Sequence, residues 1–215
     1  MKNIIFFLLF ISGFVSAQEF QNNLPKVDLK TYKKPKIKTK LLFDGCEYKI
    51  FTDERDDQQY RTITIGNQTW MAENMRYKVS GAYSNRNNPS VYYGLLYNWS
   101  QAKSACPSGW HLPTNADWDL LAQFIARDGA NALKSKTGWY NNANGTNKSC
   151  FNALPAGHFF EGNSDTGLPG YYASFWSADM KDNANVWGRT LTNDAKFLKE
   201  YRGINGFHSC RCVKD

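Results

Sequence analysis

The stretch from Tyr97 to Phe124, YNWSQAKSACPSGWHLPTNADWDLLAQF, constrains the fold more than any other part of the chain. Apolar residues recur at helical spacing from Leu95 to Ala105, and Cys106 and Pro107 interrupt that pattern. Because proline cannot continue a helix, the pattern predicts a helix that ends at this point.

A second helix is predicted directly after Pro113. Thr114 is a favourable N-cap, and Asp117 stands three residues later, where the acid of a capping box belongs. The expected buried face comprises Trp118, Leu120, Leu121, Phe124 and Ile125. Asp128 and Gly129 are expected to close this helix.

The remaining regular elements are predicted to be strands. From Tyr60 to Met71, side chains at alternate positions form two sets, as in a strand, and Gly66 and Asn67 interrupt the pattern as a turn would. This predicts a hairpin at the edge or end of a sheet. Further strands are expected at Phe151–Pro155, Tyr171–Ser177, Val186–Thr192 and Gly206–Lys214. Helices early, strands late and long Asn- and Gly-rich loops between them indicate an α+β domain.

The N-terminus reads as a cleaved export signal. Lys2 precedes an uncharged apolar run that ends in Val15, Ser16 and Ala17, small residues of the kind that a signal peptidase recognises. A spanning helix needs ~20 apolar residues, so we expect residues 1–17 to be a signal peptide and no membrane span to remain after cleavage. The protein is therefore expected in the periplasm or cell envelope, or to be secreted.

Residues 18–40 are expected to form a basic tail or linker, because seven lysines and two prolines leave it too little apolar surface to fold. The domain is expected to span residues 41–215. That part carries 18 basic and 17 acidic residues, so the high pI belongs to the tail. No nucleic-acid partner is expected, because the folded part shows no obvious basic stripe.

Five cysteines in an exported chain predict disulfides with one cysteine left over or paired between chains. Cys210 and Cys212 are one residue apart on a predicted strand and lack a second pair of ligands nearby. A zinc site needs a closer grouping than the sequence shows, so neither a metal nor a cofactor is expected.

Several segments together resemble one family. They are TITIGNQTWMAENMRY, YYGLLYNWSQAKSACPSGWHLPTNADWDLLAQF, LKSKTGW, FNALPAGHF, ASFWSA and GFHSCRCVKD. In this order, over Asp44 to Asp215, they resemble the Fibrobacter succinogenes major paralogous domain family, found in exported proteins of Bacteroidetes and Fibrobacteres. The resemblance implies a C-type-lectin-like fold, in which two helices pack on small antiparallel sheets with long irregular loops.

The same resemblance implies a disulfide between Cys106 in the first helix and Cys212 in the last strand. A second bridge between Cys150 and Cys210 is a local expectation. Cys46 is the competing partner for Cys210 and stays unassigned.

Function is expected to be non-catalytic binding of a polysaccharide or of an envelope or extracellular protein, with the oligomeric state open. The candidate ligand-binding residues are the loop aromatics Trp139, Tyr140, Tyr171 and Tyr172, whose rings can stack on sugars. A competing interpretation assigns each of these rings to loop packing or to the core, as we expect for the tryptophans in patterned segments, Trp70, Trp99, Trp110, Trp118 and Trp176. A structural or display scaffold of the cell envelope is the alternative function.

Calcium-dependent sugar binding is not expected, because the Glu-Pro-Asn, Gln-Pro-Asp and Trp-Asn-Asp triplets of calcium-dependent lectins are missing. The densest acidic groups are a segment from Asp53 to Asp57, expected as a polar hairpin turn, and a loop from Asp179 to Asn185.

Catalysis is not expected either. The segment WHLPTNADWDLL is similar to the start of a helix in formylglycine-generating enzymes, so an oxidase of that kind is the second alternative function. Their activity depends on two reactive copper-binding cysteines, whereas the cysteines here are expected in bridges. The histidines His111, His158 and His208 accompany no nucleophile motif, and His111 is expected to be structural.

Overall fold

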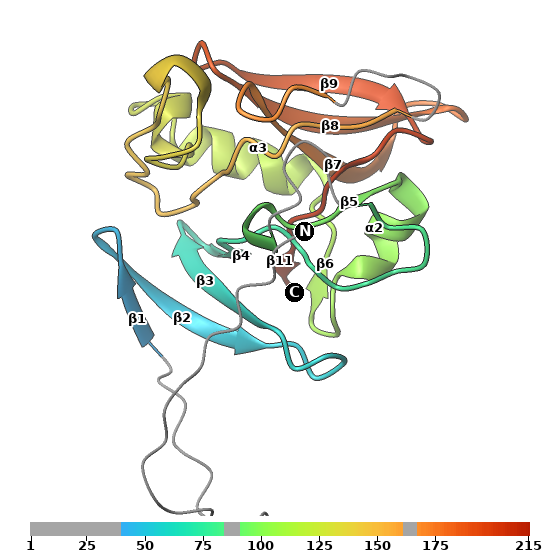
Figure 1. The fold of residues 1–215 in the computed structure, drawn as a ribbon, viewed down its shortest axis with the longest axis horizontal. Helices are drawn as coiled ribbons and strands as arrows, with labels where there is room; N and C mark the ends of the chain where they lie inside the picture. Colours follow the sequence, from blue (N-terminus) through green and yellow to red (C-terminus); the bar gives the residue numbers. More distant parts are fainter. Residues whose placement is uncertain (1–39, 84–90, 161–166) are drawn as a thin grey trace, which may run out of the picture. The chain divides into compact units, whose positions relative to one another are not determined.

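The structure, a computed structural model, describes residues 40–83, 91–160 and 167–215 (Figure 1). The expected signal peptide, residues 1–17, and all of the expected tail except Lys40 lie outside the described residues. The described part contains two helices and two sheets, which confirms the α+β class. No helix in these ranges is long and apolar enough to cross a membrane.

The first sheet is antiparallel throughout and has the strand order β1-β2-β3-β4-β11-β6. Its strands are β1 (Lys40–Phe43), β2 (Cys46–Thr52), β3 (Gln59–Ile65), β4 (Gln68–Met71), β6 (Trp110–His111) and β11 (Val213–Lys214). The β3–β4 hairpin turns at Gly66, as the alternation predicted, but both of its strands lie inside the sheet rather than at an edge. The sequence prediction missed the β1–β2 hairpin.

The second sheet has the order β5-β10-β7-β8-β9. Its strands are β5 (Leu96–Tyr97), β7 (Tyr172–Met180), β8 (Asn185–Thr192), β9 (Phe197–Gly203) and β10 (His208–Ser209). It is mixed rather than purely antiparallel, because β10 pairs with β7 in parallel. The expected long strand Gly206–Lys214 is wrong: β10 and β11 belong to different sheets, and residues 210–212 connect them. Residues Phe151–Pro155 form only an isolated bridge from Ala153 to Lys134.

The first helix, α2 (Trp99–Ala105), is shorter than expected. Asn98 and Gln101 form a capping box at its start, and Leu96 and Tyr97 before it pair as β5. The expected helix start at Leu95 was therefore wrong, because an apolar run does not by itself distinguish a strand from a helix.

The second helix, α3 (Asn115–Phe124), begins as predicted. The Thr114 hydroxyl accepts a hydrogen bond from the Asp117 amide, and the Asp117 carboxylate accepts one from the Thr114 amide at 2.8 Å. Its buried face is narrower than expected. Leu120 is 53 % exposed and Phe124 is 55 % exposed, and the helix ends before Asp128.

The α3 helix lies between the two sheets and packs directly against β7 and β8 (Figure 1). Its Trp118 is fully buried and contacts the rings of Trp70, Phe151 and Phe175. Removing such a side chain costs about 3–5 kcal/mol in a typical core. This aromatic cluster therefore fixes the position of the second sheet, which carries the candidate site.

Two disulfides join distant parts of the chain. Cys106 is bonded to Cys212, as the family resemblance implied, and Cys46 is bonded to Cys150. The expected Cys150–Cys210 bridge and the competing Cys46–Cys210 bridge are both wrong, since Cys210 is a free, buried thiol. The pairing follows from packing, because the loop that contains Cys150 (the 150 loop) lies against β2. There Cys46 is buried beside Tyr48 and Ala72 and contacts Cys150.

The acidic segment between β2 and β3 forms a turn that binds a helix end. Both carboxylate oxygens of Asp53 accept hydrogen bonds from Arg55, and the Arg55 guanidinium donates to the carbonyls of Ser104, Ala105 and Cys106. The last carbonyls of a helix lack partners within the helix, so Arg55 satisfies the end of α2. The polar-turn expectation holds for this segment.

Candidate functional site

A polar groove lies along β8 and β9 and extends to β7 and β10. It has a volume of about 1140 Å³. Side chains that point to one face of the sheet form its floor, namely Ser174, Thr190, Glu200 and Arg202, with His208 beside them. Trp187, Lys199 and Tyr201 belong to the opposite face and border the groove at the β9 edge.

The floor of the groove is a connected hydrogen-bond network. The Arg202 guanidinium donates to Thr190 Oγ1 at 2.9 Å and to Glu200 Oε2 at 3.2 Å. Thr190 Oγ1 in turn donates to Glu200 Oε2 at 2.8 Å, and it lies 3.3 Å from Ser174 Oγ. Because each side chain holds its neighbour, the floor is positioned in advance of any ligand.

Arg202 is unusually buried for a charged side chain, with 8 % of the side chain exposed. It lies over Gly188, where an added Cβ would stand 2.9 Å from the guanidinium Nε. Burial lowers the pKa of Arg202 to about 10 despite the opposing effect of Glu200. The guanidinium remains charged at neutral pH, and in the described part of the chain its one ion-pair partner is Glu200, whose side chain is 44 % exposed.

His208 completes the floor and is held in one protonation state. Its Nδ1 lies 2.9 Å from Arg202 Nη1, and a guanidinium can only donate, so Nδ1 accepts. Burial, reinforced by the charge of Arg202 and by neighbouring His158, holds the pKa of His208 well below its usual range. The neutral ring therefore carries its proton on Nε2. This Nε2–H is buried and has no hydrogen-bond partner among the described residues.

The four aromatic residues that the sequence analysis proposed for ligand binding lie in three different places, and only Tyr172 lines the groove. Trp139 is 4 % exposed and donates to Ser135 Oγ within the core, so its ring does not present a face to a ligand. Tyr140 and Tyr171 stack on each other with centroids 4.5 Å apart, outside the groove lining. Tyr172 lines the groove and contacts His158.

The residues of the groove floor were missed by sequence reasoning. They lie on three strands and a short fourth strand, with no motif among them. His158 and His208 were noted only as isolated histidines, and the structure brings their rings within 5.6 Å of each other.

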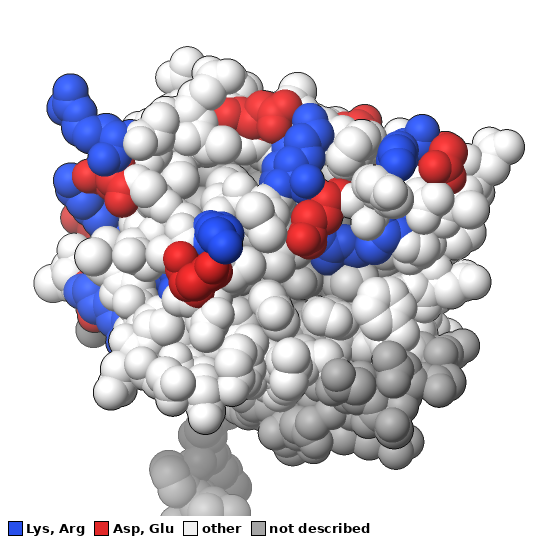
Figure 2. All heavy atoms as spheres, turned by 90° about the horizontal axis from the view of Figure 1, so that it is seen from above, with Lys and Arg blue, Asp and Glu red and all other residues white. Residues whose placement is uncertain are grey.

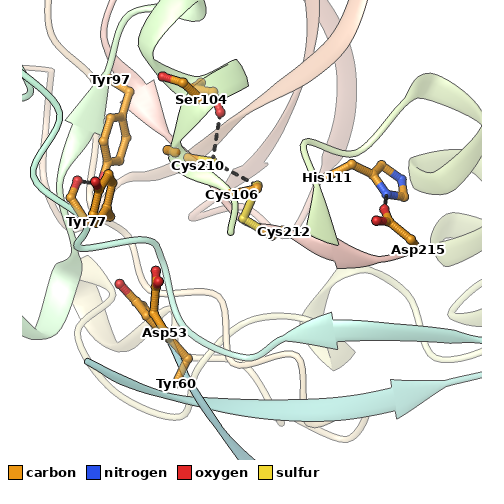
Figure 3. The surroundings of a disulfide bond; sticks show 12 residues. Asp53, Tyr60, Tyr77, Tyr97, Ser104, Cys106, His111, Cys210, Cys212 and Asp215 are labelled. Carbon is orange, nitrogen blue, oxygen red and sulfur yellow. Dashed lines mark hydrogen bonds and ion pairs between the residues drawn. A yellow bond between two sulfur atoms is a disulfide. The ribbon is translucent and has the colours of Figure 1, made fainter. Parts of the chain in front are cut away.

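A second cluster contains three cysteines. Figure 3 shows Cys106, Cys210 and Cys212 pointing toward one another, with all three sulfur atoms within 4.8 Å. Two of these sulfurs form the disulfide, and the Cys210 thiol lies 3.8 Å from Cys106 Sγ. Burial raises the pKa of Cys210, which keeps it a thiol. Metal binding and thiol catalysis both use the thiolate, so this environment opposes either role.

His111 lies between two carboxylates. Its Nδ1 is 2.6 Å from Asp215 Oδ1 (Figure 3). Its Nε2 is 3.2 Å from Asp117 Oδ2. Burial opposes ionisation of Asp117, but hydrogen bonds from Thr114 and His111 outweigh it and lower the pKa of this carboxyl. The histidine thus connects the capped start of α3 to the C-terminal strand region.

Charged side chains are mixed on the face that Figure 2 shows, where Lys and Arg groups lie next to Asp and Glu groups. Lys196 pairs with Asp194 at 2.7 Å, and Lys199 approaches Asp119 at 3.4 Å. In the loop after β7, Asp182 accepts hydrogen bonds from the Ala184 and Asn185 amides. These oxygens of the second acidic segment therefore stabilise a turn.

Fold and site together define a disulfide-bonded α+β domain with a polar groove on its second sheet. The chain belongs to the Fibrobacter succinogenes major domain family, whose family model (Fib_succ_major) matches residues 63–214. No curated protein and no solved structure matches the chain.

Proposed function

We propose that this protein is an exported, non-catalytic binding module that holds a segment of polysaccharide in the β8–β9 groove. The observation that carries the proposal is the groove itself, whose hydrogen-bonded floor has the ring of Tyr172 on the same face of the sheet, with Trp187 and Tyr201 at the β9 edge. Sugars need both features, because their apolar faces stack on rings and their hydroxyls exchange hydrogen bonds with polar side chains.

Export is supported by the leader-like N-terminus and by two disulfides, which persist in oxidising compartments. The proposal includes a C-type-lectin-like fold. Its support is the order of the elements: two helices, a late sheet, and a bridge from the end of the first helix to the last strand region.

A non-catalytic role is supported by the pairing inside the groove. The Ser174 hydroxyl lies against Thr190, and His208 Nδ1 accepts from Arg202, so these two side chains do not form a serine–histidine pair with each other. Glu200 is engaged by Thr190 and Arg202. Ser174, His208 Nδ1 and Glu200, the candidate nucleophile and bases of the floor, thus each interact with a neighbouring side chain of the floor.

A glycan array probed with three proteins tests the proposal: wild type, Tyr172→Ala and Tyr140→Ala. Tyr172 is in the groove, whereas Tyr140 is 48 % exposed and outside its lining, which makes it the matched control. We expect Tyr172→Ala to weaken glycan binding about tenfold or more, since an aromatic contact of this kind contributes about 1–3 kcal/mol. Tyr140→Ala should bind like wild type.

Two outcomes contradict the proposal. Loss of binding in Tyr140→Ala alone would place the site on the Tyr140–Tyr171 stack instead of the groove. An array and an envelope pull-down that both remain blank with folded protein would favour the structural scaffold.

A further inference from the structure

We propose that the groove selects acidic polysaccharides, with His208 Nε2–H donating a hydrogen bond to a carboxylate of the ligand. This inference rests on the proposed function and adds the chemical class of the ligand. It depends on the geometry of His208 and Arg202 and on the charges that line the groove.

The first step concerns the unpaired donor. A buried N–H without a partner costs free energy comparable to a lost hydrogen bond, so proteins rarely retain one without a use. His208 is 2 % exposed, and Arg202 fixes its proton on the nitrogen that has no partner. A ligand that fills this part of the groove must therefore bring an acceptor oxygen.

The second step concerns access to that donor. Gly206 lies beside His208 Nε2, and a Cβ at this position would stand 3.0 Å from Nε2 and 2.7 Å from the Phe160 ring. The backbone of Gly206 and the ring of Phe160 therefore enclose the donor, and a ligand oxygen reaches it when the Phe160 ring turns aside. A side chain at position 206 would crowd both the donor and that ring.

The third step concerns charge. Among the described residues, four cationic side chains line the groove, Lys181, Lys196, Lys199 and Arg202, against two anionic ones, Asp194 and Glu200. With His208 neutral, this described part of the lining carries a surplus of positive charge. Arg202 is largely removed from water, and a second carboxylate near it would be stabilised there. A carboxylate supplies both the acceptor for His208 and the charge that the lining lacks.

The test compares two probes that differ only at their carboxyl groups: an oligogalacturonate, which carries charged carboxylates, and its fully methyl-esterified, neutral form. Titration calorimetry should show the acid binding to wild type about tenfold or more tightly than the ester, because hydrogen bonds to charged groups contribute more than neutral ones. That preference should shrink as salt is raised.

Three variants locate the effect. His208→Leu removes the donor and should abolish the preference for the acid, whereas His208→Gln keeps an N–H donor in reach and should retain part of it. If either variant fails to fold, Lys199→Gln, at the exposed edge of the groove, should still reduce the preference.

A second measurement does not need a ligand. Nitrogen-15 NMR of the imidazoles should show His208 neutral with its proton on Nε2. A proton on Nδ1 would overturn the inference.

The outcomes separate the two proposals. Equal binding of acid and ester through the groove would refute the acidic-ligand inference and leave the binding function intact. Binding of neither probe, together with a blank array, would refute both.

Discussion

The free thiol of Cys210 leads to a specific prediction about the variant Cys212→Ala. This substitution removes the native bridge and frees Cys106, whose sulfur lies 3.8 Å from Cys210 Sγ. Side-chain rotation can bring two sulfurs at this distance into bonding range. We therefore expect a Cys106–Cys210 disulfide to form in Cys212→Ala under oxidising conditions.

The magnitude follows from the size of the closed loop. The native bridge joins residues 106 positions apart, and the replacement would join Cys106 to Cys210, two positions closer. The chain-entropy model gives about 4.7 kcal/mol for a loop of ~100 residues and varies only logarithmically with length. The replacement bridge should thus restore nearly all of the lost stability. The double variant Cys210→Ala/Cys212→Ala should be about 4 kcal/mol less stable than Cys212→Ala.

Guanidinium unfolding followed by tryptophan fluorescence measures this difference, and a non-reducing peptide map identifies the bridge. The control is Cys210→Ala alone, which keeps the native disulfide. Under reducing conditions the difference between Cys212→Ala and the double variant should largely disappear. If the two variants are equally unstable under oxidising conditions, with Cys106 and Cys210 both free, the reasoning is refuted.

Three further substitutions test the local interactions. Arg55→Met should lower stability by about 2–3 kcal/mol in thermal unfolding, because it leaves the carboxylate of fully buried Asp53 unpaired; adding Asp53→Asn should recover part of the loss, and no recovery would contradict the pairing. Asp117→Asn should cost about 1 kcal/mol at pH 7. The folded-state pKa of Asp117 lies below its usual value of about 3.8, so its contribution is present above that pH and is lost as the pH falls through the lowered pKa. The stabilities of variant and wild type should therefore converge as the pH is lowered below about 3.8, and a constant gap would count against this reasoning. Gly188→Ala should cost about 1–3 kcal/mol because its Cβ would lie 2.6 Å from a carbonyl oxygen, whereas the control Gly203→Ala has no atom within 4 Å and should change stability by less than about 0.5 kcal/mol; equal effects would exclude the steric explanation.

Features with a local physical cause could be predicted from the sequence. The capping box of Thr114 and Asp117 is a short-range hydrogen-bond pattern, and the structure contains it. The turn at Gly66 likewise follows from alternation around a turn residue. Asn98 and Gln101 have the same three-residue spacing and form the capping box at the true start of α2, whereas the apolar pattern placed that start at Leu95.

Features that depend on tertiary contacts could not be predicted. The partner of Cys46 is decided by the packing of the 150 loop against β2, and no spacing in the sequence encodes that choice. The groove also depends on tertiary contacts. Thr190, Arg202 and His208 become neighbours only when β8, β9 and β10 assemble into one sheet, so the sequence pattern favoured the loop aromatics as binding residues instead.

The most direct test of the central claim is an NMR titration of the isotope-labelled protein with oligogalacturonate. The groove should respond as a unit, with saturable shifts in the amides of Tyr172 and Thr190 and in the side chains of Arg202 and His208. Saturable shifts confined to Tyr140 and Tyr171, or no saturable shifts anywhere, would contradict the assignment of the groove as the binding site for this ligand class.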